Sequence, residues 1–412
     1  MHEIERGELR VPARVFDIDV SRRYDNVVDI QRFATAWCLV RRDGVVVAAR
    51  FLDIERDSQV ALEQIRDLFA ESDLPQPLPP FTQCDESLTV VVPTNRPTEL
   101  PRLLESLAHQ SDTGFSVLVV DNSPDARIAT STIATHGMNV RFCHEPTPGV
   151  THARNRGLAE VTTDLTAWID DDEVADPDWI AWIKRGFASP GRPDAIAGVM
   201  LPAELQTAAQ VDFERYGGFN KGRPMHPVVL RAGAETVRDP FFPLPSFGAG
   251  GNMAFRTQAL VSIGGFRSPL GTPFVGGEDT WVLAFILEAG GMILHWPSAV
   301  TWHYHRRTAA ELERQFYSYS AGLTAFYAAV ILTSPRHWGR IAKLVPEGMR
   351  QFLSNRGSDE LTRPPEDFPP ELLAAVRHGL LAGPWLYARE KWRQRHQNAP
   401  RLATSAAPTR SP

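Results

Sequence analysis

The sequence predicts an α/β fold in which a mainly parallel sheet is flanked by helices. The first observation is an alternation of apolar runs and amphipathic stretches between residues 88 and 200. The second is that two of the apolar runs end in aspartates, at Asp121 and at Asp170. Strands that alternate with helices form parallel sheets, and ligands bind beyond the carboxyl ends of such strands. The alternation therefore predicts both the architecture and the edge of the sheet at which a site lies.

The individual elements of this region follow from their periodicity. Short apolar runs bounded by polar or turn residues indicate strands, and apolar residues that recur with a period near 3.6 indicate helices. The predicted strands are 87–93, 115–121, 138–144, 164–170 and 194–200. The predicted helices are 97–110, 150–161 and 176–187, the last with Asp176 at its N-cap and Pro177 at its first position.

A small α+β accessory domain is predicted at the N-terminus. Strand-like alternation, a hairpin around an Asp-Gly turn and one helical stretch indicate its elements. These are the strand 11–20, the hairpin strands 33–40 and 45–54, and the helix 60–70, within a domain of residues 1–72. A Pro-rich linker, 73–87, separates this domain from the α/β domain, 88–307.

The C-terminal part is predicted to be a helical extension, 308–400, followed by a disordered tail, 401–412. Upstream of it, residues 201–246 are rich in Pro, Gly and aromatic residues and are predicted to be a long irregular loop near the site. The apolar stretch Phe316–Leu332 contains too many polar residues for a typical membrane span. A helix packed on the α/β domain is the favoured interpretation of this stretch.

The other interpretation of the same region is an interfacial helix in contact with an anionic membrane. It combines amphipathic or apolar residues with cations, the composition of helices that lie in the membrane surface. These residues are Tyr317, Tyr319, Phe326, Tyr327, Arg336, Arg340 and Lys343. The expected location is the cytoplasm, because the three scattered cysteines suggest a reducing compartment and the N-terminal residues lack the apolar core of a signal peptide. A peripheral membrane contact through this helix is the variant to test.

Composition excludes several classes of protein. The chain has 412 residues, of which 43% are hydrophobic and 22% charged, so it is not a disordered chain. The net charge of −6 argues against a nucleic-acid-binding protein. Only three cysteines are present, too few for a disulfide framework, and the N-terminal residues lack the apolar core of a signal peptide. Charge is uneven, because 303–412 carries a net +7 and the rest of the chain −13.

The strongest local signal is the run Asp170-Asp171-Asp172, which follows a predicted strand. Adjacent carboxylates repel each other unless a cation neutralises them, and Mg²⁺ or Mn²⁺ prefers such oxygens. Alternate side chains of an extended segment point the same way, so Asp170 and Asp172 share a face while Asp171 points elsewhere. The run predicts a metal–diphosphate site, and an acidic turn that caps the next helix is the plainer alternative.

Two further motifs are weak when taken singly. Glu278 and Asp279 follow two glycines at the start of a predicted helix, where acidic residues are favoured by the helix dipole. A carboxylate in this place can also act as a general base toward a hydroxyl. His303 and His305 lie on a strand-like run, and His303 is the preferred candidate for a metal ligand.

The motifs of other nucleotide enzymes and of hydrolases are missing. The sequence has no Gly-x-x-x-x-Gly-Lys-Ser/Thr loop, no Gly-x-Gly-x-x-Gly after the first strand and no Gly-x-Ser-x-Gly elbow. These absences lower the expectation of an ordinary ATPase, kinase, NAD enzyme or α/β-hydrolase.

The order of the motifs resembles the family 2 glycosyltransferases, which have a GT-A fold. The matching segments cover residues 88–307, about half of the chain. They are TVVVPTNRP (89–97), LVVDNSPD (118–125), GVTHARNRGL (149–158), WIDDDEVADPDW (168–179), GAGGNMAFR (248–256), IGGFRSPLG (263–271), GGEDTWVL (276–283) and His303. The N-terminal and C-terminal parts lie outside the resemblance.

The resemblance implies an inverting, metal-dependent transfer of a sugar from a nucleotide-diphosphate donor to an acceptor hydroxyl. It implies donor contacts through Pro93, Thr94, Asp121, Arg154, Asp170 and Asn252. Asp170, Asp172 and His303 match the ligands of a divalent metal, Mg²⁺ or Mn²⁺. Asp279 matches the catalytic base, with Glu278 beside it. The acceptor stays unassigned, and cell-envelope glycans, lipid-linked molecules and natural products all remain open.

Two other functions compete with this one. A metal-dependent nucleotidyltransferase or phosphohydrolase would use the aspartate run but leaves the Glu278-Asp279 motif without a role. A non-catalytic protein of the same fold that binds a sugar nucleotide is less expected, because Asp170, Asp172 and Asp279 are all present.

Overall fold

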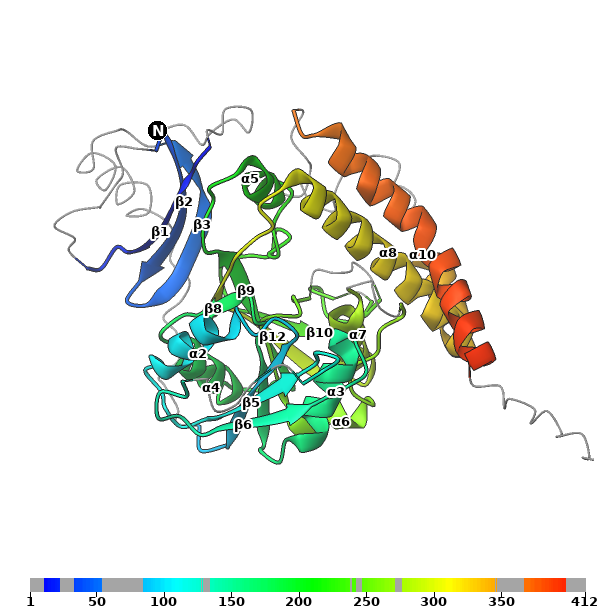
Figure 1. The fold of residues 1–412 in the computed structure, drawn as a ribbon, viewed down its shortest axis with the longest axis horizontal. Helices are drawn as coiled ribbons and strands as arrows, with labels where there is room; N and C mark the ends of the chain where they lie inside the picture. Colours follow the sequence, from blue (N-terminus) through cyan, green and yellow to red (C-terminus); the bar gives the residue numbers. More distant parts are fainter. Residues whose placement is uncertain are drawn as a thin grey trace, which may run out of the picture.

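The computed structural model describes residues 11–22, 33–53, 84–126, 128, 134–237, 239–241, 247–270, 276–344, 346 and 367–397. It contains a nine-stranded mixed sheet, a separate three-stranded sheet and a pair of long C-terminal helices (Figure 1). The predicted fold class, an α/β domain with a small N-terminal unit and a helical C-terminal region, is confirmed. The expected helix 60–70, most of the linker 73–87 and the tail 401–412 lie outside the described residues.

The central sheet has the strand order β10-β12-β9-β11-β7-β4-β5-β6, and β8 pairs with β12. Strands β7, β4, β5 and β6 are mutually parallel, whereas β11 runs antiparallel to both β7 and β9. The strands are β4 (Leu88–Thr94), β5 (Ser116–Asp121), β6 (Val140–His144), β7 (Leu165–Trp168), β8 (Glu173–Ala175), β9 (Ala195–Pro202), β10 (Val228–Arg231), β11 (Met253–Arg256) and β12 (Met292–His303).

Helices cover both faces of this sheet. One apolar core joins the sheet to α2 (Leu100–Ala108) and α4 (Trp179–Phe187). A second core joins the opposite face to α3 (Val150–Glu160), α6 (Thr257–Ser262) and α7 (Glu278–Glu288). The strands are buried on both sides, which explains why they read in the sequence as continuous apolar runs.

Helix α4 begins later than predicted. Its N-cap is Asp178, whereas the sequence suggested Asp176. The Asp176 carboxylate is instead engaged by Arg41 of the N-terminal sheet, whose Nη2 donates to Asp176 Oδ2 at 2.6 Å. Asp176, which the local sequence predicted to cap the helix, thus forms an ion pair with a distant segment instead.

The N-terminal sheet has the order β1-β2-β3, with β1 (Arg14–Asp19), β2 (Thr35–Arg42) and β3 (Val45–Asp53). The predicted hairpin is present, and both turn residues have positive φ, 51° at Asp43 and 78° at Gly44. Such angles at both positions are those of the turn that matches strand twist, which is why Asp-Gly is favoured there. The sheet packs on β9 and β12 through a shared apolar cluster.

The segment 201–246 is more regular than predicted. It contains α5 (Ala208–Arg215) and β10, so it is not a single irregular loop. Helix α5 begins with a capping box, in which Thr207 accepts from the Gln210 backbone and the Gln210 side chain accepts from the N-cap backbone. The pattern Thr-x-x-Gln was available in the sequence and is a helix-start signal.

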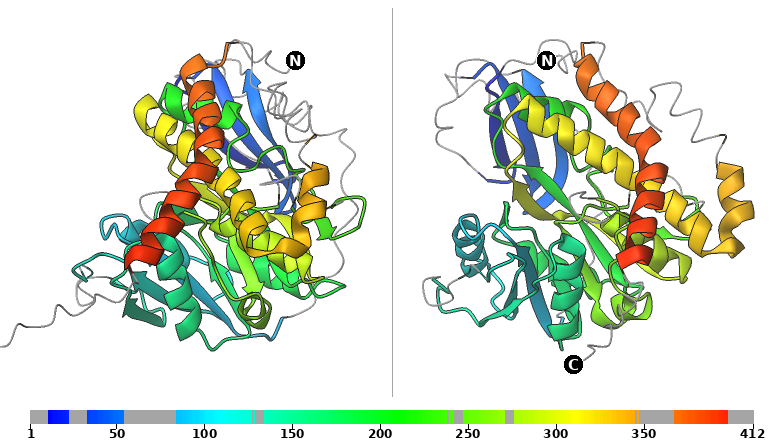
Figure 2. Two further views of the ribbon diagram at one scale, coloured as in Figure 1. Left: turned by 90° about the vertical axis from the view of Figure 1, so that its right-hand side faces the viewer. Right: turned by 45° about the vertical axis from the view of Figure 1, so that its right-hand side comes forward.

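Two long helices, α8 (Ala309–Thr333) and α10 (Pro370–Gln397), form the C-terminal part, with the short 3₁₀ helix η3 (Pro335–His337) between them. The two helices run side by side in Figure 1, and the turned views of Figure 2 show that they cross at an angle. The helices approach closely at Gly379 and Gly383, where an added Cβ would collide with the backbone of α8.

Helix α8 is long and apolar enough, by length and composition alone, to cross a membrane. In this structure it packs against the α/β domain, because Phe326 and Val330 share an apolar cluster with Phe241 and Trp281. Tyr327 donates a hydrogen bond from its hydroxyl to the Phe241 carbonyl at 2.7 Å. Phe326 and Tyr327, two of the side chains considered for an interfacial helix, therefore serve this packing, as the favoured interpretation expected.

Candidate active site

The carboxyl ends of β4, β5 and β7 meet at one edge of the central sheet. Thr94, at the end of β4, is in register with Asp121, at the end of β5. The three aspartates 170–172 follow the end of β7, which pairs with β4 on its other side. The strand-end residues singled out in the sequence are thus brought together by parallel pairing.

Asp121 is held by the loop that follows it. Its Oδ1 accepts from the Ser123 backbone at 2.8 Å and from the Ser123 hydroxyl at 2.6 Å. Its Oδ2 accepts from the Ile128 backbone at 3.0 Å. Burial acts to raise the pKa of Asp121, but these hydrogen bonds outweigh it and lower the pKa. The residue is therefore an ionised, fixed group beside Thr94 and Pro93.

Asp171 and Asp172 share one partner, because Arg96 Nη2 contacts Asp171 Oδ1 and lies 3.0 Å from Asp172 Oδ2, while Asp170 pairs with Arg154. The prediction that Asp171 points elsewhere while Asp170 and Asp172 share a face is therefore wrong, because residues 171 and 172 form a turn rather than an extended segment. The Thr94 hydroxyl donates to Asp171 Oδ2 at 2.6 Å, and the Arg96 guanidinium contacts both carboxylate oxygens. Burial raises the pKa of Asp171 even though Arg96 and Thr94 oppose the shift. Asp171 thus joins β4 to the end of β7.

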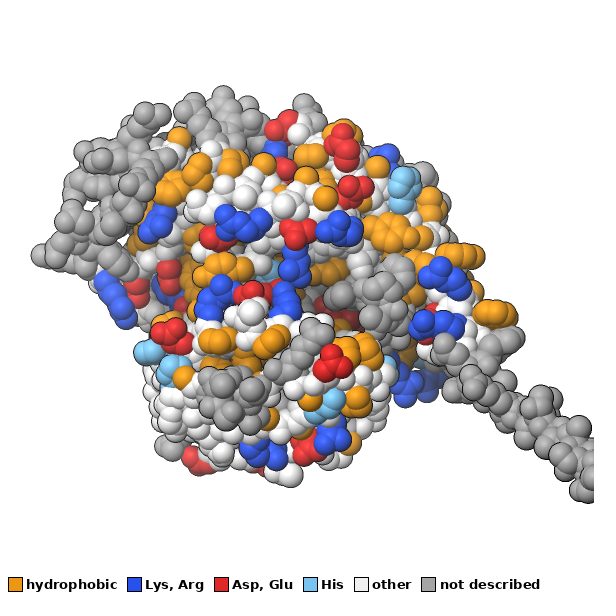
Figure 3. Space-filling view, viewed as in Figure 1, with side chains coloured by type: hydrophobic (Ala, Val, Ile, Leu, Met, Phe, Trp, Pro, Cys, Tyr) orange, Lys and Arg blue, Asp and Glu red, His pale blue; other side chains and the backbone are white. Residues whose placement is uncertain are grey.

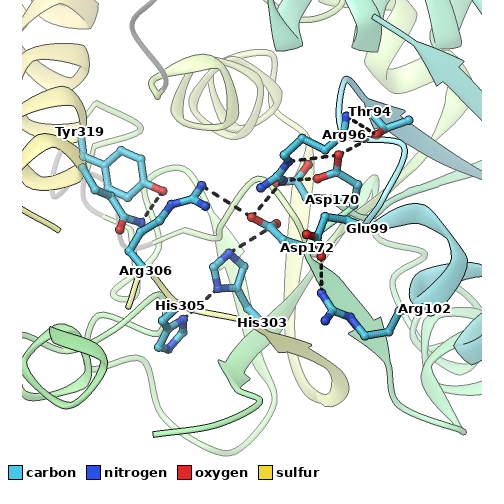
Figure 4. Close-up of polar contacts among 12 residues, drawn as sticks. Thr94, Arg96, Glu99, Arg102, Asp170, Asp172, His303, His305, Arg306 and Tyr319 are labelled. Atoms are coloured by element: carbon cyan, nitrogen blue, oxygen red, sulfur yellow. Dashed lines mark hydrogen bonds and ion pairs between the residues drawn. The ribbon is translucent and has the colours of Figure 1, made fainter. Parts of the chain in front are cut away.

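Asp172 lies at the centre of a charged cluster (Figure 4). Arg96 Nη2 is 3.0 Å and Arg306 Nη2 3.6 Å from Asp172 Oδ2, while His303 Nε2 is 3.5 Å from Oδ1. Burial acts to raise the pKa of Asp172, but His303 and the two arginines together lower it. The carboxylate is therefore ionised and lies beside two guanidinium groups, those of Arg96 and Arg306.

His305, two residues after the end of β12, determines how His303 faces Asp172. His303 Nδ1 and His305 Nδ1 share a hydrogen bond of 2.8 Å, and His305 Nε2 is 2.9 Å from Glu214 Oε1. Glu214 as a carboxylate only accepts, so it favours a proton on His305 Nε2. A neutral His305 then accepts from His303 Nδ1–H, which leaves the lone pair of His303 on Nε2, the nitrogen that faces Asp172.

This arrangement fits a divalent cation between Asp172 and His303. A carboxylate oxygen and an imidazole lone pair that face each other repel unless a cation lies between them, and both are common ligands of first-row divalent metals. Ligating histidines usually donate their other ring nitrogen to a fixed partner, as His303 does here. Within the described ranges no three His, Cys, Asp or Glu side chains form a metal cage, so further ligands would come from a substrate.

Arg154 joins the aspartate run to the Glu278-Asp279 motif. It is buried, and its Nη2 donates to Asp170 Oδ1 at 3.0 Å and to the Gly250 carbonyl at 3.0 Å. Its Nη1 donates to Glu278 Oε1 at 3.1 Å. The sequence placed Arg154 near the diphosphate and Asp170 among the metal ligands, whereas here each is the partner of the other. The arginine thus holds two segments 108 residues apart in one site.

Glu278 and Asp279 have different surroundings. Glu278 is buried, and burial raises its pKa to about 7 although Arg154 opposes the shift. Asp279 is half-buried at the start of α7, and its Oδ1 accepts from the Thr280 backbone at 2.6 Å. The preceding Gly277 has a φ of 94°, which a residue with a Cβ rarely adopts. Of the two acids, Asp279 is the one with access to a substrate.

Helix α8 contributes Tyr319 to the same region. Burial raises the pKa of Tyr319, and the charges of Asp172 and Asp279 both act in the same direction. The Tyr319 hydroxyl accepts a hydrogen bond from Gln315 Nε2 at 3.0 Å. The Tyr319 ring also packs beside Gly276, three residues before Asp279, so α8 lies next to the start of α7.

Asn252 has a different place from the one expected. Its Nδ2 donates to the Val199 carbonyl at 2.9 Å and to the Ala299 carbonyl at 2.8 Å, and its Oδ1 accepts from Trp179 Nε1 at 2.9 Å. The side chain therefore joins β9, β12 and α4 in the core, and it is not directed to a donor.

Several residues of the site were not identified from the sequence. Arg96, Arg306, Glu214 and Tyr319 lie 75 residues or more from at least one of the acids or histidines that they contact or influence. A local signal existed only for the two arginines, since each follows a motif already singled out. The others depend on how α5 and α8 fold back onto the sheet.

Comparison with known families and proteins agrees with this geometry. Residues 89–261 match the model of the family "Glycosyl transferase family 2". The chain is 25% identical over 294 residues to a pre-mycofactocin glycosyltransferase of Mycobacterium tuberculosis, covering 70% of this chain and 56% of that protein. It is 26% identical over 138 residues to a glucosyl-dolichyl phosphate glucuronosyltransferase of Haloferax volcanii, covering 32% of this chain and 39% of that protein. The chain thus spans about half the length of the first of these relatives.

Two solved structures are similar at a lower level. One is the mannosyltransferase PcManGT from Pyrobaculum calidifontis in complex with GDP-Man and Mn²⁺, with a TM-score of 0.44 and 18% identity, covering 80% of this chain and 79% of that one. The other is GalNAc-T7 with UDP, GalNAc and Mn²⁺, with a TM-score of 0.45 and 13% identity, covering 76% and 58%. The fold assignment itself rests on the sheet topology and on the family match.

Proposed function

We propose that this chain, whose residues 89–261 belong to glycosyl transferase family 2, transfers a sugar from a nucleoside-diphosphate donor to the hydroxyl group of an acceptor. The observation that carries the proposal is the buried Arg154, which pairs with Asp170 after β7 and with Glu278 at the start of α7. This double pairing supports an arrangement in which the strand-end acids and Asp279, the neighbour of Glu278, surround one site. A transfer reaction needs residues that bind the donor, here the strand-end acids, and a base for the acceptor hydroxyl, here Asp279.

The donor side of the site carries compensating positive charge. Arg96 and Arg306 are partly exposed and lie beside Asp172, where a diphosphate would meet two guanidinium groups. Thr94 and Asp121 lie side by side at the ends of β4 and β5 and would contact the nucleoside. Asp172 and His303 would hold a divalent cation, which when bound supplies Lewis-acid stabilisation of the diphosphate leaving group.

The acceptor side depends on Asp279. The acceptor oxygen attacks the anomeric carbon from the face opposite the diphosphate, and the bond from that carbon to the phosphate oxygen breaks. The diphosphate leaves with the bonding electron pair, and the hydroxyl proton passes to the Asp279 carboxylate. A single displacement of this kind inverts the configuration at the anomeric carbon. Positioning of the two substrates and stabilisation of the charge on the leaving group would supply most of the acceleration.

The direct test separates donor binding from turnover. Because the acceptor is unidentified, the first step is a thermal-shift screen of the purified chain with Mn²⁺ and UDP-, GDP- and dTDP-sugars. Turnover is then followed as release of nucleoside diphosphate from the selected donor, with water or a panel of sugars as the acceptor. Asp279→Asn should reduce this release by at least about 100-fold and leave the donor Kd within about twofold.

A matched control is Asp178→Asn, which changes another half-buried aspartate at a helix start, on α4. It should leave both quantities unchanged. Equal loss of donor binding and turnover in Asp279→Asn would contradict the assignment of the base. Release of pyrophosphate from a nucleoside triphosphate, with no sugar transfer, would favour a nucleotidyltransferase instead.

The compartment is part of the same proposal. The three cysteines, Cys38, Cys84 and Cys143, are free thiols. Free thiols support a reducing compartment, the cytoplasm, as the place where the chain works.

A further inference from the structure

The outward face of α10 carries three large apolar side chains. Leu381, Trp385 and Trp392 are 69%, 61% and 62% exposed. They are four and seven residues apart, so they lie on one face of the helix. The opposite face packs on α8 and contains Leu372, Ala375, Gly379, Gly383 and Leu386. We call the exposed set the α10 apolar stripe.

The α10 apolar stripe is bordered by cations. Arg377, Arg389, Lys391 and Arg393 are exposed on the same helix. At 3.6 residues per turn, Arg389 and Lys391 lie on opposite sides of the stripe. The Arg389 guanidinium stacks 4.9 Å from the centre of the Trp385 ring. The one acid in this part of the helix, Glu390, is half-buried and pairs with Arg393 at 3.0 Å. Figure 3 shows hydrophobic and basic side chains alternating along the right edge of the molecule, over α8 and α10.

We propose that this face of α10 docks on the surface of an anionic lipid bilayer. Tryptophan is favoured at the membrane–water interface, where its ring contacts the acyl region and its N–H stays hydrated. Each Arg or Lys beside an anionic leaflet attracts the lipid headgroups. The cations flank the stripe, so the headgroups would meet them when the apolar side chains enter the bilayer. An anionic bilayer therefore provides an apolar region for the stripe and negative headgroups for the cations on its two sides.

A second copy of the chain fits this face less well. Two α10 helices packed stripe to stripe would bring their flanking arginines and lysines close to each other. Like charges at such an interface oppose association. An anionic surface provides the opposite charge, and α10 lies at the outer edge of the fold, where a flat surface can reach it (Figure 1).

This surface differs from the segment 308–332 that the sequence suggested for membrane contact. In that segment Phe326 is buried, and Tyr327 donates to a carbonyl of the α/β domain. Arg340, one of the cations that follow, is paired with Asp239 and Glu288. Leu332 at the end of α8 and Trp338 after it stay exposed, at 67% and 55%, and the other large exposed apolar side chains of the described helix pair lie on α10.

The test is co-sedimentation of the full chain with vesicles of phosphatidylcholine and with vesicles that also contain phosphatidylglycerol. We expect binding to the anionic vesicles that weakens as salt is raised. Trp385→Ser with Trp392→Ser should weaken the partition by about tenfold or more. The change of Arg389, Lys391 and Arg393 to Gln should weaken it on the order of 100-fold.

The control is Val261→Ser, which removes an exposed apolar side chain from α6 on the α/β domain. It should bind like the unaltered chain, and circular dichroism and thermal unfolding should show that all variants fold. Brominated lipids should quench tryptophan emission in the unaltered chain and much less in the double Trp variant. The proposal is overturned if anionic vesicles do not bind the chain at low salt, or if the variants bind equally well. It is also overturned if sedimentation velocity shows a dimer that the Trp changes abolish without any lipid binding.

Discussion

His305 has no expected contact with a substrate, yet it fixes the orientation of a residue that does. Its two ring nitrogens connect His303 Nδ1 with Glu214 Oε1. In the tautomer that Glu214 favours, His303 presents a lone pair to the space beside Asp172. His305 is thus a positioning residue for His303, although it lies two residues beyond the end of β12.

The change His305→Phe should weaken Mn²⁺ binding by about 10- to 100-fold, the range found when a second hydrogen-bonding partner of a metal ligand is lost. The ring is replaced by one of similar shape, so the packing with Phe213 and Phe219 is largely kept. Mn²⁺ affinity is measured by electron paramagnetic resonance in the presence of a nucleoside diphosphate. His295→Gln changes another buried histidine, which lies on β12, and serves as the control. Unaltered affinity in His305→Phe would refute the positioning role.

His295 leads to a prediction about acid stability. Burial lowers its pKa to about 3, so it is neutral in the folded chain, whereas in the unfolded chain it protonates near pH 6.5. Between pH 6.5 and about 3 the unfolded state therefore binds one more proton at this residue. The stabilising contribution of His295 to the free energy of unfolding is therefore fully present above pH 6.5. It falls by about 1.4 kcal/mol for each pH unit between pH 6.5 and about 3.

The measurement compares the unaltered chain with His295→Gln by urea unfolding between pH 7 and 4.5. The buried acid Glu278 has a raised pKa of about 7 and acts in the opposite direction over this range, so the total slope alone is not informative. The difference between the two chains isolates His295, and it should shrink as the pH falls. A difference that does not change with pH would show that His295 can be protonated in the folded state.

At the scale of elements, the helix pair α8 and α10 depends on two glycines. A Cβ at Gly383 would collide with the Thr324 hydroxyl and the Ala321 carbonyl, and the latter is backbone that cannot move away without shifting α8. Gly379 has the same relation to Tyr317. The spacing of four residues places both glycines on the face that meets α8.

Gly383→Val should therefore destabilise the chain by about 1–3 kcal/mol, the usual cost of overpacking. Alanine and valine both have a higher helix propensity than glycine, so a propensity effect alone would stabilise the chain. Gly339→Ala is the matched control, because an added Cβ there meets no atom within 4 Å and should be neutral or slightly stabilising. Thermal unfolding and limited proteolysis of the C-terminal part measure both effects. A stabilised Gly383→Val would show that the helices do not pack as described.

The elements also indicate which features the sequence can predict. The strand-end positions of Asp121 and of the run 170–172 follow from local periodicity. The directions of the three aspartates were misjudged, because residues 171 and 172 form a turn and share Arg96. The start of α4 was misplaced because Asp176 pairs with Arg41, 135 residues away. The role of Asn252 was misjudged for the same kind of reason, since its three hydrogen bonds depend on strands that meet only in the folded chain.

At the scale of the whole molecule, the N-terminal sheet is connected to the α/β domain through Asp176. Arg41 Nε donates to Asp17 Oδ1 at 2.8 Å within the sheet, and its Nη2 donates to Asp176 Oδ2 at 2.6 Å in the α/β domain. Trp302 Nε1 also donates to Asp176 Oδ2 at 3.4 Å, and the next residue along β12 is His303. A buried ion pair thus connects the small sheet with the strand that carries the metal-ligand candidate.

Arg41→Met should lower the free energy of unfolding by about 3–5 kcal/mol, because it leaves the Asp176 carboxylate buried without its cation. The combined change Arg41→Met with Asp176→Asn should recover part of this loss, since the uncompensated charge is then gone. Arg22→Met is the control, because Arg22 lies in the turn after β1, its side chain is 74% exposed and its ion pair with Asp19 is long, at 3.7 Å. Exposed pairs of this kind contribute about 0–1 kcal/mol. Urea unfolding followed by tryptophan fluorescence measures all three, and a loss in Arg41→Met no larger than in Arg22→Met would mean that the two sheets are stabilised independently.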